Sequence, residues 1–202
     1  MIVLKSQIKI LFALVLLLGC TLDIYAQPVK REYEKSVKPE ALPTKVLEIA
    51  APFINDAEQV DYYEELNGEE LFYEIKMEWK GKQLSIEFYE NGQLMDIEQL
   101  ITMDEVNEDA RQPIQEYLDS YDRYKITRLQ RQYSAEDQDE EDEEVIEEYL
   151  EYDTDDLTVR YEMVIYLKGQ GRYGLYELLF DDDGELIETQ KVERRSPDNV
   201  LY

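Results

Sequence analysis

The sequence contains no histidine and a single cysteine among its 202 residues. Without histidine the chain cannot build a Ser-His-Asp or Cys-His relay, an imidazole proton shuttle or a histidine-rich zinc or iron site. One cysteine also leaves no pair for an intramolecular disulfide, so the fold must be stabilised by its core. These absences exclude the commonest catalytic centres.

Basic residues are scarce as well: 21 Lys and Arg face 48 Asp and Glu, which gives a formal net charge of -27. A protein that binds nucleic acid needs Lys and Arg gathered on one surface, so we expect no nucleic-acid partner. The chain is nevertheless 44% hydrophobic and has 17 Tyr and 5 Phe, which is too apolar for a wholly disordered acidic polypeptide. We therefore expect a folded protein.

Residues 1–26 have the pattern of an export signal. Lys5 and Lys9 supply positive charge, residues 10–18 form an unbroken apolar run, and Ala26 is a small residue suited to precede the cleavage site. The apolar run is too short to span a membrane comfortably as a helix of the mature chain. We expect an exported protein, periplasmic or secreted, with no membrane span after cleavage.

An alternative processing site is Cys20. The sequence Leu17-Leu18-Gly19-Cys20 resembles the bacterial lipobox, in which the cysteine carries the lipid and becomes the new N-terminus, although Leu18 is larger than the residue usual at its position. This alternative predicts a lipid anchor at Cys20 and an outer-membrane lipoprotein. The other interpretation of Cys20 is a small apolar residue of a discarded peptide.

The rest of the chain reads as a tether, two similar units and a tail. Residues 27–39 combine charge with proline and show no apolar period, so we expect a tether. Residues 40–101 predict one helix followed by four antiparallel strands, and residues 102–193 predict the same order with an acidic insertion at residues 136–156. Residues 194–202 form a tail.

The similarity of the two units is visible at fixed offsets. The helical stripe of the first unit recurs 68 residues later with apolar or aromatic side chains throughout: Leu42, Val46, Ile49, Ala50 and Phe53 match Ala110, Ile114, Tyr117, Leu118 and Tyr121. The alternating strand recurs 88 residues later: Leu71, Tyr73, Ile75, Met77 and Trp79 match Val159, Tyr161, Met163, Ile165 and Leu167. The pattern indicates a tandem repeat, and it leaves open whether the two sheets are continuous.

This arrangement resembles the PepSY-like family, whose tandem form is similar to the β-lactamase inhibitor protein. The resemblance covers residues 42–192 and depends on Tyr73-Glu74-Ile75 and Tyr161-Glu162-Met163, together with a Phe-x-x-x-Gly-x-Leu hairpin in each unit. It implies an α+β fold and a non-enzymatic module that binds or regulates a secreted or envelope protein. It supplies no catalytic residues, and nothing matches the contact residues of the inhibitor, so inhibition of a β-lactamase is not predicted.

The acidic insertion is a candidate contact for a cation. Fourteen of its 21 residues are Asp or Glu and none is basic; the densest run is Glu140, Glu141, Asp142, Glu143 and Glu144. The functional interpretation is capture of a basic polypeptide or of Ca²⁺. The alternative is a solvated loop or short helix with no ligand, anchored through Val145, Ile146, Tyr149 and Leu150.

Side chains in the polar phase of the strands are candidate protein contacts. Phe72, Val164 and Tyr166 should face solvent if helices cover only one side of the sheet, and exposed aromatic groups often anchor protein interfaces. The turn from Gly169 to Arg172 is a second candidate surface. The alternative for all of them is packing against the other unit or the insertion.

We therefore expect a binding module rather than an enzyme, with an unidentified protein of the envelope or medium as its partner and with no cofactor or resident metal. A hydrolase using two carboxylates is the weakest alternative, because so acidic a chain brings some pair together by chance and no spacing singles one out.

Overall fold

The computed structural model describes residues 29–136, 141–152 and 154–193. The fold class is α+β, as predicted, and the described elements fall into two units of different composition. The first unit comprises α2 (Thr44–Ile54), β3 (Ala57–Asn67), β4 (Glu70–Trp79), β5 (Lys82–Tyr89) and β6 (Leu94–Leu100). The second comprises α3 (Glu108–Asp119), β7 (Arg123–Ser134), β8 (Thr158–Gly169), β9 (Arg172–Asp181) and β10 (Leu186–Val192), with α4 (Asp142–Glu151) between β7 and β8.

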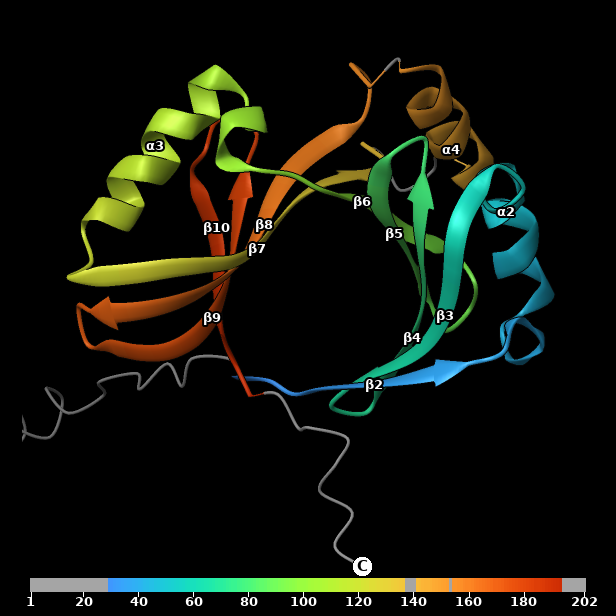
Figure 1. Cartoon of the computed structure of the whole chain (residues 1–202), viewed down its shortest axis with the longest axis horizontal. Coiled ribbons are helices and arrows are strands. Elements are labelled where there is room, and N and C mark those ends of the chain that lie inside the picture. Colours follow the sequence, from blue (N-terminus) through green and yellow to red (C-terminus); the bar gives the residue numbers. More distant parts are fainter. Residues whose placement is uncertain (1–28, 137–140, 153, 194–202) are drawn as a thin grey trace, which may run out of the picture.

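The described strands form one ten-stranded sheet rather than two four-stranded sheets, which corrects the predicted architecture. Strands β6 and β7 join the two units as an antiparallel pair, with Ile97 opposite Tyr133 and Leu100 opposite Gln130. Figure 1 shows that the sheet is strongly curled and that α2, α3 and α4 lie on its outer side. The units are also unequal, because α4 is inserted in the second and two extra strands precede the first.

Those two strands lie in the segment that we expected to be a tether. β1 (Val29–Lys30) and β2 (Glu32–Val37) are separated by Arg31 alone, yet β1 pairs with β10 and β2 pairs with β3, at opposite edges of the sheet. The segment 29–37 therefore connects the two edges, and we call it the strap. It lacks a periodic apolar signal because β2 is an edge strand with little burial, held by its backbone ladder and by ion pairs.

The helices cover the apolar outer face of the sheet in two clusters. In the first unit, Phe53 of α2 packs on Trp79 of β4 with 5.3 Å between ring centroids, and Tyr149 of α4 lies 5.7 Å from Phe53. Val145 and Ile146 of α4 are buried in the same cluster, as their helical spacing predicts. The second half of the acidic insertion is thus an amphipathic helix anchored to the core.

The second cluster lies beneath α3. Ala110, Ile114 and Leu118 are fully buried against β8 and β9, whose buried partners include Met163 and Phe180. The apolar phase of both units was therefore predicted correctly. No helix in the described ranges is long and apolar enough to cross a membrane.

Candidate functional site

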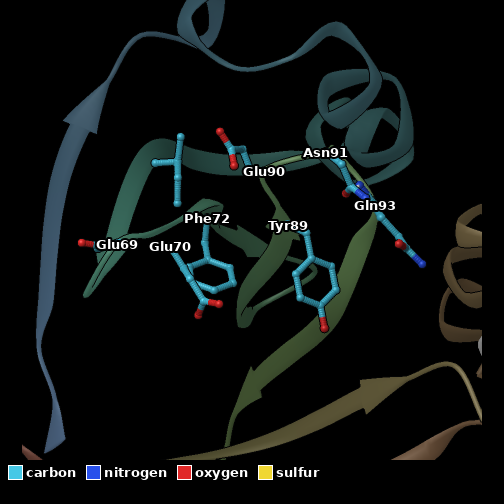
Figure 2. A pocket seen from close by; sticks show the side chains of 8 residues that line it. Glu69, Glu70, Phe72, Tyr89, Glu90, Asn91 and Gln93 are labelled. Atoms are coloured by element: carbon cyan, nitrogen blue, oxygen red, sulfur yellow. The ribbon is translucent and has the colours of Figure 1, made fainter.

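Phe72 lies in a surface groove at one end of the first unit, where the β3–β4 and β5–β6 turns meet (Figure 2). Phe72 of β4 is paired in register with Tyr89 of β5, and their ring centroids are 6.2 Å apart. The groove has a volume of about 550 Å³, and we call it the aromatic groove; its lining residues are Glu69, Glu70, Leu71, Phe72, Tyr89, Glu90, Asn91 and Gln93.

The aromatic groove combines an apolar centre with an acidic rim. Tyr89 is 43% exposed, and Figure 2 shows the Phe72 ring between the side chains of Glu70 and Glu90, with the Tyr89 ring to one side. A Lys or Arg side chain fits such a surface, because its aliphatic stem packs on the rings while its charge meets carboxylates. The structure thus places Phe72 beside Tyr89. Tyr89 was not among the contacts predicted from the sequence.

The two candidate contacts on β8 differ in solvent exposure. Tyr166 is 53% exposed, as its strand phase predicts. Val164 is only 1% exposed, which corrects its assignment as a surface contact. β8 is an inner strand of a curled sheet, and Val164 is flanked in register by Arg128 of β7 and Glu177 of β9. Side chains on a concave surface converge, so these neighbours cover a short side chain such as valine.

The turn from Gly169 to Arg172 is clamped to α3. Arg172 donates hydrogen bonds to the hydroxyls of Tyr117, at 2.8 Å, and Tyr121. Burial and the hydrogen bond with Tyr117 raise the pKa of Tyr121 to about 12. Gly169 has φ +126°, and a Cβ there would lie 2.8 Å from a backbone nitrogen, so the position requires glycine. Both residues have a structural role here, and the proposed partner contact at this turn is untested.

The acidic candidates of the insertion also differ in exposure and contacts. Glu140 and the lipidation candidate Cys20 lie outside the described residues. Glu141, Glu143 and Glu144 are exposed at the start of α4. Asp142 instead points inward: its Oδ1 accepts a hydrogen bond from the Leu94 backbone N–H at 3.1 Å, and its Oδ2 lies 2.9 Å from Lys45 Nζ. Its carboxylate fastens α4 to the first unit, which makes it unsuited to capturing a partner.

Strand alternation alone does not predict the chemistry of the other sheet face, which we call the inner face because the helices lie on the opposite side (Figure 1). Three carboxylates stand side by side on it across three strands. Glu74 of β4 is opposite Glu87 of β5, and Glu87 is opposite Asp96 of β6. We call these three residues the acidic row. Like charges directly opposite each other in a sheet are ordinarily destabilising.

Among the described residues, only the Glu74 end of the acidic row has a basic partner within the sheet. Glu74 accepts a hydrogen bond of 2.5 Å from Ser85 Oγ and lies 3.0 Å from Lys76 Nζ. Burial alone would lower the pKa of Lys76, but Glu74 and Glu34 of the strap raise it above its ordinary value. In the described chain no hydrogen bond or ion pair reaches Glu87, and Asp96 Oδ1 has no hydrogen-bond partner.

The polar lining of the inner face continues into the second unit. Glu98 of β6 accepts hydrogen bonds from Gln130 and, at 2.8 Å, from Gln132. Gln132 also donates to Glu162 of β8 at 3.2 Å, and Arg128 donates to Glu162 at 3.0 Å. Amide and guanidinium donors therefore hold Glu98 and Glu162, whereas Asp96 Oδ1, at the end of the acidic row, has no such donor among the described residues.

Burial changes the protonation of these groups. It raises the pKa of the Glu87 and Glu98 carboxyls well above their usual range, and neighbouring carboxylates add to the effect. Burial raises the pKa of Asp96 to about 7; Glu162 adds to this rise, while Lys30 and Arg160 oppose it. Glu87 and Asp96 of the acidic row therefore release their protons at higher pH than ordinary surface carboxylates do.

Comparisons with known proteins do not assign the chain to a family. No family model matches it, and no curated protein matches it. A crystal structure of a BLIP-like protein from Bacteroides fragilis NCTC 9343 is similar, with a TM-score of 0.47 and 13% sequence identity over 80% of this chain and 94% of that one. Membership of the PepSY-like family stays a prediction.

Proposed function

We propose that this protein is a non-enzymatic, exported module that binds a secreted or envelope protein through the aromatic groove. The observation that carries the proposal is the partly exposed Phe72–Tyr89 pair inside a rim of Glu69, Glu70 and Glu90. Aromatic side chains supply much of the binding energy at protein interfaces, and charge around them selects the partner and speeds its approach.

The chemistry of the groove defines the partner surface. A formal net charge of -27 repels acidic proteins and attracts basic ones. The rim carboxylates would pair with Lys or Arg, and the rings would contact an apolar side chain or the stem of the basic residue. The proposed partner therefore presents a basic residue beside an apolar one. Regulation or inhibition of that partner is the proposed consequence of binding.

The export proposal is supported by the pattern of residues 1–26, with cleavage after Ala26 and lipidation at Cys20 as its two forms. The acidic insertion supports a binding role less well, because Val145, Ile146 and Asp142 serve to anchor α4. We therefore place the partner contact at the aromatic groove and leave capture of Ca²⁺ or a basic polypeptide by the insertion as the secondary proposal.

Chemical cross-linking in the native envelope and medium fractions tests the function. The wild-type chain is expected to form a specific cross-linked complex that Phe72→Ala plus Tyr89→Ala reduces at least tenfold, because the apolar anchors are lost. Tyr173→Ala is the matched control, since Tyr173 is 79% exposed and lies outside the groove. Equal yields from the double variant and wild type, with both folded by circular dichroism, would remove the aromatic groove as the contact.

A further inference from the structure

The acidic row is an arrangement that a fold does not need for its own stability. Glu87 stands between Glu74 and Asp96 in register, and only Glu74 has a basic side chain within ion-pair distance among the described residues. A local arrangement that opposes folding is commonly kept at a functional site. At the other end of the row, Asp96 has a buried oxygen, Oδ1, without a hydrogen-bond partner in the described chain.

Asp96 also faces a groove. Its side chain belongs to a residue only 8% exposed, its Oδ1 has no hydrogen-bond partner in the described chain, and it lines a second groove of about 490 Å³. We call this the inner groove; it is bounded by β6, β7, the start of α4 and residues of β8 and β9. An unpartnered, buried carboxylate oxygen in a groove is a ready acceptor for a charged donor.

The charge of the inner groove favours a cation. Its lining includes the carboxylates of Asp96, Glu136 and Asp142 against one guanidinium, that of Arg160, and the charge of Asp142 is already paired with Lys45. Arg160 also lines the neighbouring hollow, whose acidic residues are Glu136, Asp155, Asp181 and Asp182. Arg160 therefore has acidic neighbours besides Asp96 and does not cancel the negative charge of the groove.

The chain itself shows which cation the inner face accepts. Lys30 of the strap reaches across to Glu177 of β9, and its Nζ lies 3.0 and 2.9 Å from the two carboxylate oxygens. Both side chains are largely buried, with 17% and 11% exposure. A metal ion fits less well, because no group of three or more potential ligand residues is gathered in the described part of the chain, whereas Ca²⁺ takes six to eight oxygens.

The inner groove adjoins the aromatic groove. Tyr89 and Gln93 line both, so a partner segment seated on Phe72 and Tyr89 can continue past Gln93 toward Asp96. We propose that Asp96 anchors a lysine or arginine side chain that a protein partner inserts into the inner groove. The proposal deepens the proposed function, since it rests on a protein partner, and it adds a second contact of defined charge.

Binding of a cation beside Asp96 is linked to its ionisation. The charged groups that face Asp96 or line its groove lie on several elements: Lys30, Glu74, Glu87, Glu98, Glu136, Asp142, Arg160 and Glu162. A cation favours the ionised form of Asp96, whose pKa of about 7 means that part of the population is protonated at neutral pH. Affinity should therefore rise between pH 6 and pH 8 as the competing proton leaves.

The test uses a defined probe and the full mature chain. Acetyl-Gly-Arg-Gly-amide is titrated by two-dimensional NMR, with the citrulline peptide of nearly the same shape but no charge as its control. Wild type is expected to bind the arginine peptide with shifts at Asp96 and Gln132, and Asp96→Asn to weaken it at least tenfold, the loss of one charge-assisted hydrogen bond. Asp96→Ser is the second variant, in case the asparagine changes the fold.

The outcomes separate this proposal from the proposed function. Equal affinity for the citrulline peptide, unchanged affinity in both Asp96 variants, or a Ca²⁺ titration that produces the same Asp96-dependent shifts as the peptide would each overturn the arginine site. In the cross-linking assay, Asp96→Asn should lower the yield of complex when Phe72 and Tyr89 are intact. If Asp96→Asn leaves that yield unchanged while the aromatic double variant abolishes it, the inner-groove proposal fails and the proposed function stands.

Discussion

Both faces of the sheet contain buried side chains, but these side chains have opposite chemistry. The outer face contributes side chains such as Ile75 and Phe88, which are fully buried beneath the helices. The inner face contributes Glu74 and Glu98, which are 3% and 2% exposed although no α-helix covers them (Figure 1). Curvature buries the inner face, because the side chains of a curled sheet converge on its concave side.

The difference shows that strand alternation reports which residues share a face and does not report how buried the polar face is. Apolar burial on the outer face supplies stability in proportion to area removed from water. Buried carboxylates on the inner face cost free energy unless donors, cations or protons compensate them. The outer face therefore accounts for folding, and the inner face is the better place to look for a ligand.

The largest loss of stability is expected when a buried side chain of the outer face is truncated. Phe88→Ala removes a fully buried ring from the first cluster, and Phe180→Ala does the same in the second. Each should lower the free energy of unfolding by about 3–5 kcal/mol, through lost transfer energy and the cavity left behind. Urea denaturation measures this. A loss below about 1 kcal/mol in either variant would mean that the cluster is not packed as described.

On the inner face, removing a carboxyl group should raise the free energy of unfolding, and only at high pH. The pKa of Asp96 rises on folding from 3.8 to about 7, so its protonated form stabilises the fold below pH 4 and that contribution is lost as pH rises through 7. Asp96→Asn removes the cost of ionisation. It should be about 1–3 kcal/mol more stable than wild type at pH 8, an amount below the full linkage of the shift.

The control for this prediction is the same pair of proteins at pH 4, where their stabilities should converge. Carboxylates far from Asp96 change the stability of both proteins alike, so the difference between the two reports Asp96 and the neighbours linked to it, Glu87 and Glu98. A difference that is independent of pH, measured by thermal unfolding, would contradict an ionisable Asp96 on a desolvated face.

A smaller loss of stability is expected at the strap, which connects the two edges of the sheet. Lys30→Ala leaves the buried Glu177 carboxylate without its ammonium partner and should cost roughly 1–2 kcal/mol at pH 7. Lys35→Ala breaks an ion pair with Glu64 in which Lys35 is 57% exposed, and should cost less than about 0.5 kcal/mol. Equal losses in urea denaturation would show that burial does not distinguish the two pairs.

Much of the outer face could be predicted from sequence because its signal is local. The stripe from Val46 to Phe53 and the alternation from Tyr73 to Trp79 each depend on neighbours a few residues away, and both appear in the structure. The joining of the two units through β6 and β7 has no local signal. The strap is missed for a related reason, since its partners on β3 and β10 lie far away in sequence.

The candidate site was predicted only in part. Phe72 is on the face that its strand phase indicates, but its neighbour Tyr89 has no distinguishing pattern in the sequence. The predicted exposure of Val164 is wrong, because strand alternation does not report the curvature of the sheet. In the sequence, Glu74 is distinguished only as part of a repeated Tyr-Glu-apolar motif. A glutamate at matching strand positions of both units was the available signal for an acidic inner face.

The most direct test of a buried, proton-holding inner face is an NMR titration of the Asp96 side-chain carboxyl carbon in the intact protein. Desolvation by the curled sheet predicts a midpoint near pH 7, with Asp96→Asn used to assign the signal. A midpoint below pH 5, close to the ordinary value for aspartate, would show that the carboxylate is solvated and would contradict the account.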